Sequence, residues 1–293
     1  MRKKQYNFEF LDYIDENANN LIQDCGEKWY IIEISPQGLD KMEKLREYII
    51  KQYVLYEAFC GELGWCFSRC THIISNQINR LVSDFIEKRG DIIELDERIA
   101  SLYSKSIIND IVSNTKTHMK SVDIVKLAKA MRLFNNKDYY TCATILAGLI
   151  DSQSINQALN DTTENTINVS QCWKCYGKVI QEHFASKYFE EKFPYKETVK
   201  SGRIPKSINF FASLKEGFDL YNQQVIDIIS LSFSMLKFFD NSDWTDKLNS
   251  EIPSSVNRHW LAHGMYEWND IRRVDCIKMI LMLELIVSLY DSI

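Results

Sequence analysis

Near its C-terminal end the chain gathers, in one short stretch, side chains that could do chemistry. Arg258, His259 and His263 follow Asn257 within six residues. A guanidinium keeps its positive charge near neutral pH, whereas an imidazole gains and loses a proton there. This pair suits RNA cleavage without a metal. The histidine would move a proton between the ribose 2′-OH, the scissile phosphate and the 5′-oxygen, and the arginine would hold the phosphate as its negative charge grows.

The flanking residues predict that this stretch is a short helix. The segment from Pro253 to Ser255 is a helix-start signal, and Gly264 is a stop signal. His259 and His263 are four residues apart and share a helix face. Arg258 and His263 are about 140° apart around an ideal helix, and we expect the long arginine stem to bring both heads to one point. The positive end of the helix dipole and free backbone N–H groups would favour a phosphate there.

The elements that must position these side chains are predicted to be helices, so the fold class is all-α. Only 10 Gly and 4 Pro occur in 293 residues, few for an all-β chain. Apolar residues recur at three- and four-residue steps, as in amphipathic helices. One short strand is expected at residues 29–34. Helices are expected at 42–56, 74–85, 96–112, 123–131, 139–149, 173–184 and 218–239, and from about residue 270 onward.

The chain is predicted to have two parts. A polar stretch at Ser113 to Ser121 gives a soft boundary between a helical region at 1–120 and a bundle at 121–293. The last helix is apolar nearly all round after Lys278, so we expect it to lie inside the bundle with neighbours on several sides.

The residues from Asn257 to Gly264, leading into a terminal apolar helix, resemble the signature of HEPN domains. The similarity covers roughly residues 123–293. The segment Tyr139 to Asp151 is similar to the helix of such proteins that carries an acidic residue after an apolar stripe. The resemblance implies a helical bundle and metal-independent endoribonuclease activity, often in toxin–antitoxin, abortive-infection or other antiviral systems. It also implies homodimers in which two such motifs meet in one cleft.

Carried over to this sequence, the resemblance makes Arg258 and His263 catalytic. His259 takes a polar slot where Asn is commoner, and Asn257 and Asp151 are supporting residues. The expected partners are RNA, a second copy of the chain, and an antitoxin or defence-system protein, with no cofactor. The alternative function is a non-catalytic module that binds RNA or a nucleotide, or serves as a scaffold.

Three sets of residues have spacings that a metal or redox site could use. His259 and His263 could form half a zinc site, but Trp260 stands where the zincin motif has its Glu. The second set is the CxxC pair at 172–175, which has no second pair and is expected to be two thiols at the edge of the core. The third set does not match a usual zinc finger: Cys60, Cys66, Cys70 and His72. We therefore expect no metal, and we expect the isolated His72, His118 and His183 to be surface or cap residues.

Charge and cysteine use narrow the class of protein further. The net charge of -5 excludes a basic nucleic-acid scavenger but leaves room for a local basic cleft. Met1 to Phe10 lacks the apolar core of a signal peptide, and the most apolar run, Met279 to Leu289, is too short to span a membrane. Eight cysteines without a secretory signal suggest reduced thiols, so we expect a cytoplasmic protein without a membrane partner.

Overall fold

The computed structural model describes residues 90–161 and 255–288 without interruption. It also describes residues 3–5, 60–61, 63–67, 74, 77–78, 80–82, 84–85, 230–231, 234–235, 237–239 and 251–253. The strand predicted at 29–34 and the helices predicted at 42–56 and 173–184 lie outside the described residues.

The described residues are mostly helical, with connecting turns and one small strand pair, which confirms the predicted all-α class. The strands, β1 (Lys3–Gln5) and β2 (Glu251–Pro253), pair in parallel with Lys3 opposite Glu251. The helices are α4 (Ile92–Leu102), α5 (Lys105–Thr117), α6 (Ser121–Asn135), α7 (Tyr139–Asp161), α12 (Arg258–Ala262) and α13 (Arg273–Ser288).

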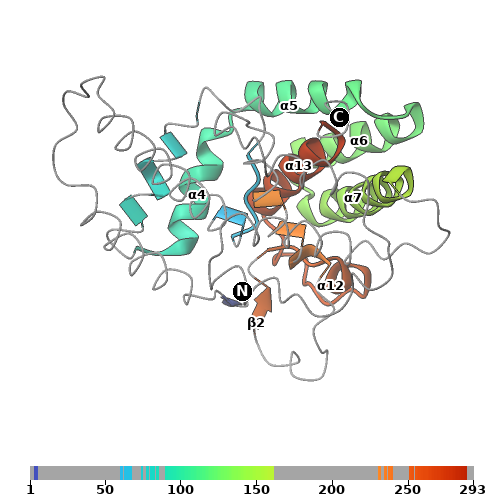
Figure 1. Ribbon diagram of the computed structural model, residues 1–293. Helices are drawn as coiled ribbons and strands as arrows, with labels where there is room; N and C mark the ends of the chain where they lie inside the picture. Colours follow the sequence, from blue (N-terminus) through green and yellow to red (C-terminus); the bar gives the residue numbers. More distant parts are fainter. Residues whose placement is uncertain are drawn as a thin grey trace, which may run out of the picture.

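Helix α13 forms the centre of the fold, as its apolar sequence predicts. Every residue from Val274 to Ser288 is buried. α13 packs against α7, α5 and α4, while α6 covers α7 (Figure 1). Two of these neighbours, α4 and α5, precede residue 121 and α7 follows it. The central helix therefore contacts helices from both sides of the predicted domain boundary.

The single helix predicted at 96–112 is wrong, because the chain forms two helices there. α4 ends at Leu102, and Ser104 caps α5 by accepting a hydrogen bond from the Ile107 N–H at 3.3 Å. Between them the fully buried Tyr103 stacks on Trp65, with ring centroids 5.9 Å apart. The apolar periodicity continues across this corner, and the serine cap was the signal that marks the break.

The break predicted between the helices at 123–131 and 139–149 is confirmed. Lys137 adopts a φ of 63°, which reverses the chain after α6. Asp138 then caps α7, since its Oδ1 accepts a hydrogen bond from the Thr141 N–H at 3.2 Å. This turn lets α6 and α7 pack against each other.

A buried polar cluster of Asp96, Lys278 and Trp65 joins α4 to α13. Lys278 Nζ donates to Asp96 Oδ2 at 2.8 Å and to the Leu63 carbonyl at 2.6 Å. Trp65 Nε1 donates to Asp96 Oδ1 at 2.8 Å, and Lys278 Nζ lies 5.1 Å from the Trp65 ring centroid. Charged groups in a core need such partners, because burial removes their hydration.

The turn beside this cluster also touches the segment that leads into α12. Gly64 has a φ of +82°, and a Cβ added there would lie 2.8 Å from the Cβ of Ser255. Only glycine satisfies both this backbone conformation and this close approach. The buried cluster thereby fixes where the chain begins its path toward Arg258.

Candidate functional site

Helix α12 is a single turn whose N-terminal cap is Asn257. The Asn257 Oδ1 accepts a hydrogen bond from the Trp260 N–H at 3.1 Å. The short helix predicted for Asn257 to His263 is confirmed, with these two residues as its caps. The start signal at Pro253 to Ser255 does not supply its cap, because Pro253 belongs to β2 and Ser255 is buried against Gly64. The extended backbone of this segment postpones the helix by several residues.

The other end of α12 is closed by Gly264, as predicted. Gly264 has a φ of +64°, a conformation that glycine adopts without steric cost. Its N–H donates to the Leu261 carbonyl at 3.2 Å, and the Met265 N–H donates to the Trp260 carbonyl at 2.9 Å. These two bonds satisfy the carbonyls that a helix end leaves unpaired. The turn is thus fixed at both ends.

Asn257 is a buried anchor for the site. Only 3% of the residue is exposed. Its Nδ2 donates to the Lys237 carbonyl at 3.0 Å, and its backbone N–H donates to the Tyr266 hydroxyl at 2.9 Å. Tyr266 in turn donates to the Ser255 carbonyl at 3.4 Å, and burial raises the pKa of Tyr266 well above its usual range. Asn257 therefore positions α12, and its burial keeps it from contacting a ligand.

Arg258, the first residue of α12, pairs with Asp151 of α7. The Arg258 Nη1 lies 2.5 Å from the Asp151 Oδ1, and the two side chains are 32% and 31% exposed. The guanidinium carbon lies 5.0 Å from the centroid of the Phe239 ring. The structure thus joins two residues that the sequence placed 107 positions apart. The carboxylate and the ring hold the guanidinium at the edge of the protein.

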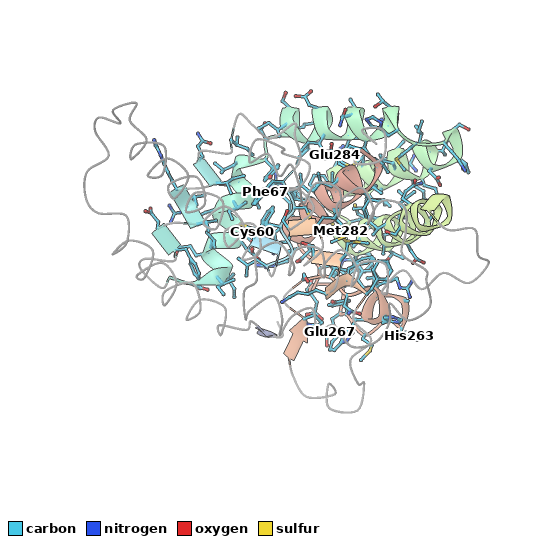
Figure 2. All side chains as sticks on the ribbon, in the orientation of Figure 1. Cys60, Phe67, His263, Glu267, Met282 and Glu284 are labelled. Atoms are coloured by element: carbon cyan, nitrogen blue, oxygen red, sulfur yellow. The ribbon has the colours of Figure 1, made fainter. Side chains whose placement is uncertain are left out.

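The two histidines lie further along the same turn. His263 is the C-cap residue of α12 and is exposed, and its backbone N–H donates to the His259 carbonyl at 3.0 Å (Figure 2). His259 is half-buried. Arg258 and His263 are thus at opposite ends of α12, about 7 Å apart along an ideal helix axis.

The phosphate site predicted at the helix N-terminus stays a prediction. α12 has only 5 residues, so few peptide dipoles are aligned in it. The Trp260 N–H, which would face an anion, is already bonded to Asn257. The group suited to an anion is the Arg258 guanidinium. It carries five N–H donors, and its ion pair with Asp151 does not exhaust them.

Two residues of the site gave no signal in the sequence. Phe239 fits the apolar stripe of the helix predicted at 218–239, and Tyr266 lies outside every predicted helix and motif. Their roles depend on contacts with Arg258 and Asn257, which only the folded chain brings about. A pattern of residue types along the chain cannot reveal such pairs.

The metal-like spacings are partly outside the described residues. Cys60 and Cys66 are buried, whereas Cys70, His72, His183 and the CxxC pair at 172–175 lie in parts of the chain without described structure. Across the described residues, no three His, Cys, Asp or Glu side chains gather as metal ligands would. His118 is the C-cap of α5, as predicted. None of the described helices is long and apolar enough to cross a membrane.

Comparison with family models, curated proteins and solved structures finds no match to this chain. The resemblance to HEPN domains therefore stays a prediction based on residues 139–151 and 257–264.

Proposed function

We propose that this protein is a metal-independent endoribonuclease of the HEPN type. In this proposal Arg258 binds the scissile phosphate and His263 transfers the proton. The main support is the Arg258–Asp151 ion pair, in which a guanidinium is held at the protein edge by a carboxylate and a ring yet stays one-third exposed. A phosphate could approach such a group without unfolding anything around it.

The chemistry follows from these two groups. His263 would take the proton from a ribose 2′-OH, and the 2′-oxygen would attack the phosphorus. The bond from phosphorus to the 5′-oxygen would break, and that oxygen would leave with a proton delivered by an imidazolium. The products would be a 2′,3′-cyclic phosphate and a 5′-hydroxyl. Arg258 would stabilise the charge that gathers on the phosphate oxygens.

The supporting residues act through Arg258 and α12. Asp151 would orient the guanidinium, and Asn257 fixes the turn that carries it. His259 would supply a second imidazole one turn before His263. We further propose that two copies of the chain bring two such motifs into one cleft, as the HEPN resemblance implies. In the cytoplasm such an enzyme would serve as a toxin or antiviral effector, restrained by an antitoxin or defence partner.

The test is cleavage of single-stranded RNA by three purified proteins: wild type, Arg258→Ala and His263→Ala. Each variant should lose roughly 100-fold or more in rate, the usual effect of removing one charge-stabilising or proton-transferring group. EDTA should have no effect on the wild type. The matched control is Ile93→Ala, an exposed position on α4, which should cleave normally. Full activity in either variant would remove that residue from the mechanism, and loss on chelation would point to a metal enzyme.

The ion pair also favours a second candidate, a non-catalytic RNA-binding or scaffold module. Asp151 offsets part of the positive charge of Arg258, which suits a structural contact as well as a catalytic one. This candidate predicts RNA binding that weakens steeply as salt rises, with no cleavage product. Detection of a 2′,3′-cyclic phosphate end would exclude it.

A further inference from the structure

An exposed tryptophan, Trp268, stacks on the half-buried Tyr140, and Trp268 follows the proposed catalytic residues closely in the sequence. Trp268 follows α12, and Tyr140 belongs to the first turn of α7. Their ring centroids are 5.5 Å apart and their planes differ by 18°. Trp268 is 59% exposed, and every other aromatic side chain among the described residues is buried or half-buried. Tyr140 therefore supports one side of a ring that is otherwise largely in solvent.

The turn that carries Trp268 is closed by its own hydrogen bonds. The Glu267 N–H donates to Asp270 Oδ2 at 2.8 Å, and the Asp270 N–H donates to the Glu267 carbonyl at 3.0 Å. Asp270 is buried, so this turn is anchored in the protein. A Trp held by a closed turn and a stacked neighbour needs little ordering when a flat ligand binds.

The position of the pair connects it to the proposed site. Trp268 comes five residues after His263, and Tyr140 lies on α7 eleven residues before Asp151. Eleven helical residues span about 16 Å, which a short stretch of extended RNA can bridge.

Charged residues close to Tyr140 and Trp268 in the sequence indicate how a bound RNA strand would be oriented. Lys137 is exposed in the turn just before α7, three residues from Tyr140, and could bind a backbone phosphate. Glu267 is exposed directly before Trp268 and would repel one. A nucleobase on the Trp268 ring, with its phosphates toward Lys137, fits both charges.

We propose that Trp268 and Tyr140 form a stacking platform for one unpaired nucleobase of a single-stranded RNA. This inference rests on the proposed function and adds a substrate-positioning site to it. Stacking accepts every base, because each base has an aromatic face. The platform would therefore select unpaired over paired RNA and set the distance between the bound base and the cut, with little preference for sequence.

The experiment uses DNA oligonucleotides with a single ribonucleotide, which fixes the cut because only that residue has a 2′-OH. An abasic nucleotide is moved one position at a time, and kcat/KM is measured for wild type, Trp268→Ala and Trp268→Phe. In the wild type one abasic position should lower kcat/KM by roughly 5- to 150-fold, the effect of losing one stacked base. Trp268→Ala should be slower by a similar factor and insensitive to that position. Trp268→Phe should retain most of the wild-type profile, and Ile93→Ala should retain all of it.

Binding measurements separate failure of this inference from failure of the proposed function. Fluorescence anisotropy with His263→Ala, and with His263→Ala plus Trp268→Ala, measures affinity for intact single-stranded RNA. If the wild type cleaves but Trp268→Ala keeps its rate and abasic profile, the platform is overturned while the nuclease stands. If neither the wild type nor any variant cleaves RNA, but Trp268→Ala weakens RNA binding 5-fold or more, the stacking platform is supported and the proposed nuclease activity is contradicted. Equal RNA affinity with and without the Trp268→Ala substitution, or no RNA binding at all, would contradict the stacking platform.

Discussion

Two clusters in this protein have the same three ingredients, a carboxylate, a cation and an aromatic ring. In the first, Asp96, Lys278 and Trp65 lie in the core, and the two charged side chains are 0% and 4% exposed. In the second, Asp151, Arg258 and Phe239 lie at an edge, and both charged side chains are about one-third exposed. Alike in composition, the clusters differ in their access to water.

This difference in solvent exposure gives the two clusters different roles. In the core both oxygens of Asp96 are bonded, and Lys278 reaches a carbonyl as well, so no ligand can enter. At the edge the planar guanidinium of Arg258 keeps donors for an incoming anion. Burial makes the first cluster a structural joint, and partial exposure makes the second a candidate for binding and catalysis.

The largest effect on stability is expected from Lys278→Met. The variant leaves the Asp96 carboxylate buried without its cation, which should cost about 3–5 kcal/mol in the free energy of unfolding. Urea titration followed by circular dichroism measures this loss. Adding Asp96→Asn to the variant should recover part of it, because the unpaired charge is then gone. A loss below about 1 kcal/mol would mean that the buried cluster contributes no more than a surface pair.

The next effect should come from Gly64→Ala, which strains the turn between the two clusters. The new Cβ meets Ser255 at 2.8 Å on a backbone with a φ of +82°, so a loss of about 1–3 kcal/mol is expected. The control is Gly148→Ala on α7, where an added Cβ meets nothing within 4 Å. That variant should gain about 0.5–1 kcal/mol, since alanine favours a helix. Equal melting temperatures for the two variants would contradict this account of the turn.

An effect of similar size, but dependent on pH, is expected at Tyr266. Removing its hydroxyl in Tyr266→Phe leaves the buried Asn257 N–H without its acceptor, a cost of about 1–3 kcal/mol at pH 8. Burial raises the pKa of Tyr266 in the folded state. Its stabilising effect is therefore complete below about pH 10, where the unfolded tyrosine is neutral, and falls above it. By pH 11 the advantage of the wild type over Tyr266→Phe should shrink by about 1.4 kcal/mol. Chemical denaturation at the two pH values tests this, and an unchanged difference would argue against the raised pKa.

The smallest effect on stability is expected from Arg258→Ala. An ion pair whose side chains are about one-third exposed contributes about 0–1 kcal/mol, so the variant should unfold almost like the wild type. Its RNA cleavage should nevertheless be lost, as proposed above. Asp151→Asn should be equally stable and should cleave more weakly than the wild type. If Arg258→Ala destabilised the protein as much as Lys278→Met, both clusters would be structural and the proposed site would be left without its arginine.

The features that could be predicted from the sequence are those that depend on residues close together in the chain. The helices around residues 121–135 and 139–161, the central position of α13 and the stop at Gly264 follow from local periodicity and from glycine chemistry. The corner at Tyr103 and Ser104 was missed, because an apolar stripe continued across it. Ser104, a residue type that favours helix N-caps, is the local signal for that break.

The remaining features depend on parts of the chain that are far apart. The pairing of β1 with β2 joins residues 3–5 to residues 251–253, and this pairing holds Pro253 extended where a helix start was expected. The partners of Arg258 and Lys278 likewise come from distant segments. Candidate site residues can be predicted from their types and spacing. Their interaction partners are determined by how distant segments pack in the folded chain.

The central place of α13 has a consequence for synthesis on the ribosome. Lys278 bonds a carbonyl 215 residues earlier, and Glu284 accepts a hydrogen bond from Asn114, 170 residues earlier. Until α13 leaves the exit tunnel, α4, α5 and α7 lack the surface that buries their apolar faces. We therefore expect these helices to complete their folding only after α13 has been synthesised, so that any site resting on them forms late.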